Sequence, residues 1–269
     1  MTPSKDADAV GAGSQSAADA IWQHWQAGTV MAELPVGSRP TDRSQGYAIQ
    51  ARVAAHGAGQ PTGWKIAATS RAGQLHIGVD GPLAGRLLAE HTYATGASLS
   101  LTGNRMRVAE PEFAFRCGQR LPPRTQPYSM DEVLAAMEAL IPAIEVPDSR
   151  FEDYATAGAA QLIADLACAR EFVLGVPTRT QWRELDLSRH TVRGSIVGQL
   201  ERDGIGANVL DDPRLALAWL VNELSSLGIP LEAGEVVTTG TCMIPLAIVP
   251  GCHVIADFGV LGHVEAHFA

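Results

Sequence analysis

Two glutamates alternate with apolar residues in the segment 108–115, which reads VAEPEFAF. Successive side chains of an extended chain point to opposite faces, so Glu110 and Glu112 share one face of a strand. Carboxylates so placed lie roughly 6–7 Å apart and repel by about 2.5 kcal/mol at an effective dielectric constant near 20. A fold tolerates this repulsion in open water, or where a cation or a proton neutralises the pair.

A third carboxylate, Glu145, stands in the apolar run IPAIEVP between two prolines. A lone charge in such a run is costly unless it is paired or coordinated. Three carboxylates without a basic residue in either segment suit a hard divalent cation, whose remaining ligands are water and substrate oxygens. The alternative is that Glu110 and Glu112 lie on a solvated face, while Glu145 pairs with an arginine such as Arg150.

Lys65 is a candidate proton carrier, because GWKIAA places its cation beside a strand-like apolar run. A desolvated lysine can have a pKa low enough for proton transfer. The alternative is a surface lysine that buries its stem and keeps its ammonium group in water. Asp80, in IGVDGP, is by itself no more than a turn residue.

The elements that must position these side chains suggest an α+β chain with three parts. Residues 1–17 are small and polar and are expected to be a disordered leader. A helical part over 18–61 has helices at 17–28 and after the Thr41-Asp42 pair. A β-rich catalytic body is expected over 62–269, with only two more helices, one after the Ser129 capping box and one opening at Asp212-Pro213.

Composition excludes several classes of protein. The chain has 269 residues, with 29 acidic against 20 basic ones and a formal charge of −9, which argues against a nucleic-acid backbone binder. Its four cysteines are far apart, so neither a disulfide scaffold nor a structural zinc site is expected. No run of 18 apolar residues and no signal peptide are present, so we expect a cytoplasmic protein that does not enter a membrane.

Taken in order, the motifs resemble the 2-oxopent-4-enoate hydratase and 4-oxalocrotonate decarboxylase group of the fumarylacetoacetate hydrolase superfamily. The resemblance spans about residues 18–268. Its motifs are GWKIAATS around Lys65, GVDGP around Asp80, EPEFAF from Glu110, PAIE ending at Glu145, AD at Asp165, VLG at 173–175, GT at Thr241, and PG followed by ADFGVLG over 250–262.

The resemblance implies a mixed β-sheet core with peripheral helices, usually assembled as a homo-oligomer. It implies that Glu110, Glu112 and Glu145 hold Mg²⁺ or Mn²⁺, and that Lys65 and Asp80 line the pocket and handle protons. The substrates it implies are small 2-oxo or 2-hydroxy-dienoic acids. Candidate substrate-binding residues are Asp165, Cys168, Arg170 and Thr241.

One segment departs from the family pattern. Residues 165–170 read DLACAR where the family often has a DNAS-like sequence, so Leu166 and Cys168 replace an amide and a hydroxyl group. Arg170 adds a charge where a small residue is usual. The substrate contact made by this segment, and with it the identity of the acid, stays open.

The leading hypothesis is a metal-dependent hydratase that adds water to a 2-hydroxy-2,4-dienoate. The second is a metal-dependent decarboxylase of a 2-oxo-3-enedioate, whose second carboxylate Arg170 or Arg71 could hold. Carbon–carbon hydrolysis of an acylpyruvate ranks lower, because no His–Glu pair precedes the three glutamates. A non-catalytic binding protein on the same scaffold is the alternative from a different class.

Overall fold

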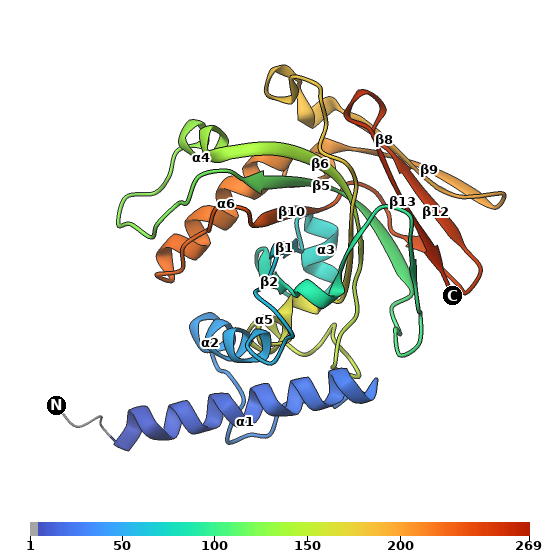
Figure 1. Ribbon diagram of the computed structural model, residues 1–269. Coiled ribbons are helices and arrows are strands. Elements are labelled where there is room, and N and C mark those ends of the chain that lie inside the picture. Colours follow the sequence, from blue (N-terminus) through green and yellow to red (C-terminus); the bar gives the residue numbers. More distant parts are fainter. Residues whose placement is uncertain (1–4) are drawn as a thin grey trace.

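Two curved sheets form the body of the protein in a computed structural model that describes residues 5–269 (Figure 1). The larger sheet has the order β2-β1-β10-β5-β6-β7-β3, with β11 beside β5, and the smaller has the order β4-β13-β12-β8-β9. The strands of the larger sheet are β1 (Gly63–Ala67), β2 (Leu83–Leu87), β3 (Thr92–Ala94), β5 (Val108–Cys117), β6 (Met137–Val146), β7 (Glu171–Leu174), β10 (Val236–Thr241) and β11 (Leu246–Ala247). Those of the smaller sheet are β4 (Ala97–Leu99), β8 (Thr191–Ile196), β9 (Leu200–Ile205), β12 (His253–Asp257) and β13 (His263–Phe268).

Helices lie around these sheets, with α1 running beneath α2 and α5 in Figure 1. The α-helices are α1 (Lys5–Ala27), α2 (Arg43–Ala54), α3 (Arg71–His76), α4 (Met130–Ala136), α5 (Ala159–Ala164) and α6 (Pro213–Ser226). The short 3₁₀ turns are η1 (Ala89–His91), η2 (Leu166–Cys168), η3 (Trp182–Glu184), η4 (Leu187–Arg189), η5 (Gly206–Asn208) and η6 (Gly259–Leu261). The expected α+β class is confirmed, and within residues 5–269 no helix has the length and hydropathy needed to span a bilayer.

Local sequence signals explain where several elements begin. Asp42 and Asp212 cap the N-termini of α2 and α6 through their side chains, and Pro213 takes the first turn of α6. The capping box at Ser129 and Glu132 is present at the start of α4. The C-terminal part of the expected β-rich body forms β10, β11, β12 and β13.

The disordered leader is wrong for residues 5–17, which belong to α1, and residues 1–4 lie outside the described part of the chain. The small-residue composition that suggested disorder is also rich in alanine, the strongest helix former. Among the side chains of α1 that the structure describes, burial begins at the end of this segment: Ala17, Ala18 and Ile21 are fully buried, so the packing energy of these side chains comes from residue 17 onward.

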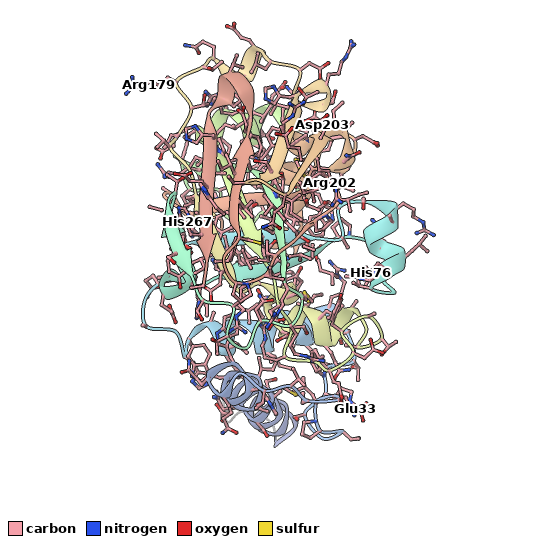
Figure 2. All side chains as sticks on the ribbon, turned by 90° about the vertical axis from the view of Figure 1, so that its right-hand side faces the viewer. Glu33, His76, Arg179, Arg202, Asp203 and His267 are labelled. Carbon is pink, nitrogen blue, oxygen red and sulfur yellow. The ribbon has the colours of Figure 1, made fainter. Side chains whose placement is uncertain are left out.

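Two further helices, α3 and α5, were not expected, and α4 is shorter than its apolar spacing suggested. Met137 and Leu140 continue the helical spacing of apolar residues after the capping box, but they lie in β6, where both are buried. A short apolar run fits either a helix or a buried strand, and pairing with β5 decides in favour of the strand. Figure 2 shows α3, which carries His76, projecting from the body, and no residue of α3 is buried.

Candidate metal and substrate site

The three glutamates meet on one face of the β5–β6 pair. Glu110 stands directly opposite Glu145 in the antiparallel register, and Glu112 follows two residues along β5 on the same face. One carboxylate oxygen from each residue lies within 4.8 Å of the other two. Glu112 and Glu145 are fully buried and Glu110 is partly exposed, so the alternative of a solvated strand face is wrong.

A bulge in β10 lies beside Glu112, and this part of the strand supplies hydrogen-bond donors to its carboxylate. The register between β10 and β5 shifts between Thr238 and Thr241, which releases the backbone of Gly240 from the ladder. The Gly240 N–H donates to Glu112 Oε2 at 2.8 Å, and the Thr238 hydroxyl donates to the same oxygen. Gly240 has a φ of 94°, and a Cβ there would lie 2.1 Å from Thr69 Oγ1, so this position requires glycine.

Lys65 supplies a single cation to this cluster of carboxylates. Its Nζ lies 2.9 Å from Glu145 Oε1 and donates a hydrogen bond to the carbonyl of Ala167 at 3.0 Å. Lys65 is 3% exposed, which rules out a surface lysine, and the alternative in which Glu145 pairs with Arg150 is wrong. Arg150 instead pairs with Asp165, and both side chains are buried.

Burial and mutual repulsion perturb the carboxyl groups. Burial, followed by the charge of Glu145, raises the pKa of Glu110 to about 7, while Lys65 opposes this shift. The pKa of Glu112 is raised well above its usual range by burial and by the charges of Glu145 and Glu110. For Lys65, burial acts to lower the pKa, but the neighbouring carboxylates outweigh it and the net pKa is raised. Lys65 is therefore an ammonium ion at neutral pH, contrary to the expectation of a lowered pKa.

The donor set fits a hard divalent cation. Buried polar atoms normally have a hydrogen-bond partner. Glu112 Oε1 and both carboxylate oxygens of Glu145 accept no hydrogen bond. The contact of Lys65 Nζ with Glu145 Oε1 is an ion pair that lacks hydrogen-bond geometry. Three carboxylates with one lysine carry a net charge of −2 when ionised, which one divalent cation balances. Oxygen ligands from three carboxylates are the set that Mg²⁺, Ca²⁺ and Mn²⁺ prefer.

A cavity of about 960 Å³ opens at this cluster. Lys65, Glu110, Cys168 and Thr241 line it, together with residues of α3 and of the segment 243–245. The lining combines apolar side chains with polar groups that include Thr69, Arg71, Tyr154 and Asn208. A concave, largely apolar pocket with convergent polar groups is typical of a small-molecule site.

The other sequence-derived site residues divide into two groups. Cys168 and Thr241 line the cavity, and their role in substrate binding stays a prediction. Burial raises the pKa of the Cys168 thiol to about 12. Asp80, Asp165 and Arg170 are not among the lining residues: Asp80 is exposed, Asp165 is fully buried against Arg150, and Arg170 pairs with Asp148. The second carboxylate suggested for Arg170 therefore has no contact there, whereas Arg71 does line the cavity.

Sequence reasoning missed the groups that hold the glutamates and the lysine in place. Thr238 and the Gly240 N–H bind Glu112, and the Ala167 carbonyl binds Lys65. The TTGT sequence offered a signal, since a glycine inside a strand often marks a bulge. No local signal distinguishes the carbonyl of Ala167 from any other.

Comparison with known proteins points to one family. No family model matches the chain. A 2-keto-4-pentenoate hydratase of Paraburkholderia xenovorans is 32% identical over 248 residues, 89% of this chain and 90% of the relative. A 4-oxalocrotonate decarboxylase of a Pseudomonas species is 32% identical over 205 residues, 76% of this chain and 77% of the relative.

Solved structures share the fold. A 4-oxalocrotonate decarboxylase from Pseudomonas putida G7, complexed with magnesium and adipate, superposes with a TM-score of 0.86 at 23% identity and covers 100% of both chains. A protein from Oleispira antarctica assigned as a fumarylacetoacetate isomerase/hydrolase superposes with a TM-score of 0.56 at 15% identity, over 77% of this chain and 93% of the other. The mixed sheet expected for the fumarylacetoacetate hydrolase superfamily is confirmed.

Proposed function

The chain belongs to the 2-keto-4-pentenoate hydratase and 4-oxalocrotonate decarboxylase family of lyases, and from this we propose that it hydrates a 2-hydroxy-2,4-dienoate to a 4-hydroxy-2-oxo acid with a divalent cation. The observation that carries the proposal is the meeting of Glu110, Glu112 and Glu145 with Lys65 at one cavity. Curated hydratases at 32% identity over most of the chain support it.

The chemistry has two parts. Protonation of the substrate at C5, with loss of the 2-hydroxyl proton, converts the 2-hydroxy-2,4-dienoate into a 2-oxo-3-enoate. Water then adds across the C3–C4 bond, with its hydroxyl group on C4 and a proton on C3. A bound divalent cation supplies positive charge that stabilises negative charge developing on the 2-oxygen. Lys65 is an ammonium ion that lines the cavity, so it can donate a hydrogen bond or a proton to the substrate.

Other groups bind and orient the substrate. Thr241 lines the cavity and stands opposite Glu112 in the β10–β5 pair; its hydroxyl donates to the Met243 carbonyl at 3.0 Å, so toward a substrate it can act as an acceptor. Cys168 offers a neutral thiol, because its raised pKa keeps the proton on sulfur at neutral pH. The apolar lining excludes water from the substrate chain, which limits competing reactions of the reactive enol. Asp80 keeps its expected role in proton handling as a proposal from family resemblance.

The cation that we propose is Mg²⁺ or Mn²⁺. Both prefer carboxylate oxygen ligands and leave positions for water and substrate. Family resemblance also leads us to propose assembly as a homo-oligomer. From composition we propose a cytoplasmic location without nucleic-acid or membrane partners.

An assay of the purified protein with 2-hydroxypenta-2,4-dienoate and Mg²⁺ tests the proposal. We expect loss of the dienol absorbance and formation of 4-hydroxy-2-oxopentanoate, and neither in a variant that combines Glu110→Ala with Glu112→Ala. Failure of the wild type to turn over any of a panel of 2-hydroxydienoates and 2-oxo acids would instead favour the non-catalytic binding protein.

A decarboxylase is the second candidate, since a 4-oxalocrotonate decarboxylase reaches the same 32% identity to this chain, over 205 residues against 248 for the first hydratase. Arg71 lines the cavity and could pair with the second carboxylate of a 2-oxo-3-enedioate. Release of CO₂ from 4-oxalocrotonate, at a higher kcat/KM than hydration of the monoacid, would select this function over the hydratase.

A further inference from the structure

The turn that touches Lys65 has an unusual backbone. Leu166, Ala167 and Cys168 have φ values of 53°, 49° and 65°, so three consecutive residues other than glycine are left-handed. Residues with a Cβ avoid this region, because the Cβ approaches the following carbonyl. Such a run persists only where the surrounding structure enforces it.

The Arg150 side chain bridges the two ends of this turn. Its guanidinium donates to the carbonyl of Asp165 on one flank and to the carbonyl of Ala169 on the other, the latter at 3.0 Å. It also pairs with the Asp165 carboxylate, which accepts from the Arg150 backbone N–H at 3.0 Å and from Ser149 Oγ at 2.7 Å. Arg150 is 2% exposed and lies 4.1 Å from the centroid of the Trp25 ring of α1. Neither Arg150 nor Asp165 lines the cavity.

Gly85 lets the turn approach the lysine. It stands directly opposite Lys65 in the β1–β2 pair, so both positions face the same side of the sheet. A Cβ at Gly85 would lie 1.8 Å from the Leu166 carbonyl oxygen, so only glycine admits the turn at this distance. The next carbonyl, that of Ala167, accepts the hydrogen bond from Lys65 Nζ.

We propose that Arg150 is a positioning residue for Lys65. By holding both flanks of the left-handed turn, it aims the Ala167 carbonyl at Nζ, and this carbonyl fixes where the ammonium group stands beside Glu145. The alternative is that the Arg150–Asp165 pair stabilises the fold and has no particular effect on Lys65. The catalytic consequence rests on the proposed function, whereas the structural consequence does not.

The variant R150Q/D165N tests the proposal, because it removes both buried charges together and leaves neither unpaired. Lys65 is one of two lysines in the chain, so protein labelled with [ε-¹³C]lysine gives two side-chain signals, which K5R assigns. We expect the Lys65 signal to move in R150Q/D165N. We also expect kcat to fall about 10- to 100-fold, because a displacement on the ångström scale has this effect. KM and the Kd for Mn²⁺ should stay within about threefold, since a residue that acts only in the transition state changes kcat alone.

The pair Arg43–Glu223 provides the matched control, since it joins α2 to α6 and neither residue lines the cavity. R43Q/E223Q should leave the Lys65 signal and kcat unchanged. A folded R150Q/D165N with an unmoved Lys65 signal overturns the proposal, as does a kcat that falls only in proportion to the folded fraction. If this variant does not fold, R150K is measured in the same way. R150K keeps a charge beside Asp165 but lacks the planar fork that binds both carbonyls, so an unmoved Lys65 signal in R150K would also overturn the proposal.

The two proposals fail separately. A wild type without turnover removes the hydratase, while the lysine signals still show whether Arg150 positions Lys65. Turnover in the wild type together with an unmoved signal in the folded variants removes the positioning role and leaves the hydratase in place.

Discussion

Glu110 and Glu145 stand directly opposite each other on neighbouring antiparallel strands, with like charges on the same face of the sheet. Like charges placed this way normally destabilise a sheet. Two things relieve the repulsion here. Lys65 Nζ lies 2.9 Å from Glu145 Oε1, and the pKa of Glu110, raised to about 7 by burial and by the charge of Glu145, leaves part of this group protonated at neutral pH. A divalent cation would remove the remaining repulsion.

The hydroxyl of Thr238 should contribute to cation affinity. Thr238→Val removes the donor to Glu112 without changing the shape of the side chain, and we expect the affinity for Mn²⁺ to fall about 10- to 100-fold. Calorimetric titration measures it. Thr239→Val is the matched control, because this equally buried hydroxyl donates to the Phe113 carbonyl and not to a carboxylate. Equal affinity in T238V and the wild type would contradict the prediction.

Cation binding should release protons near neutral pH. Glu110 has a pKa of about 7 without the cation, above its usual value of 4.5, so part of its population is protonated at pH 7. A cation favours the ionised form, so protons leave as it binds and affinity rises as the pH increases toward and past 7. The neighbouring charges that set this balance are Glu112, Glu145 and Lys65. Titrations in buffers of different ionisation enthalpy count the protons, and a count of zero between about pH 5.5 and 7.5 would refute the prediction.

Removal of the cation should destabilise the protein. A ligand present at 100 times its Kd stabilises the native state by about 2.7 kcal/mol, which predicts a higher Tm with saturating Mg²⁺ than with EDTA. The reason in this chain is that the cation pairs with carboxylate oxygens that otherwise have no hydrogen-bond partner. The double variant E110Q/E112Q should show little response to Mg²⁺. A Tm shift of equal size in that variant would place the stabilising cation elsewhere.

Gly85 should not tolerate a side chain. Gly85→Ala places a Cβ 1.8 Å from the Leu166 carbonyl oxygen, and we expect a loss of about 1–3 kcal/mol in the free energy of unfolding. Gly81→Ala is the control, because nothing lies within 4 Å of a Cβ there. Its effect should stay within about 0.5 kcal/mol. Denaturant titration compares the two, and equal stabilities would show that the turn can move away from β2 without cost.

Much of the site could be predicted from sequence because its signals are local. The alternation around Glu110 and Glu112 sets their common face, and the apolar run around Glu145 shows that its charge needs compensation. The capping residues of α2, α4 and α6 are also local signals, and the structure confirms them.

The failures concern choices that depend on distant parts of the chain. Glu145 could have paired with either Lys65 or Arg150, and only the tertiary arrangement decides for Lys65. Similarly, Met137 fits a helix or a strand by spacing, and its pairing partner in β5 decides. The left-handed turn at 166–168 has no glycine to announce it, so its strain is invisible in the sequence.

The contact between the Trp25 ring and the Arg150 guanidinium links α1 to the turn whose Ala167 carbonyl binds Lys65. A chimera that exchanges the N-terminal helix between relatives would therefore also replace the aromatic ring that packs against this guanidinium. Swaps that carry the tryptophan with the helix should remain active more often than swaps that lose it. Helix α1 and the body should therefore be exchanged together, since a recombination boundary at residue 61 would separate Trp25 from its contact with Arg150.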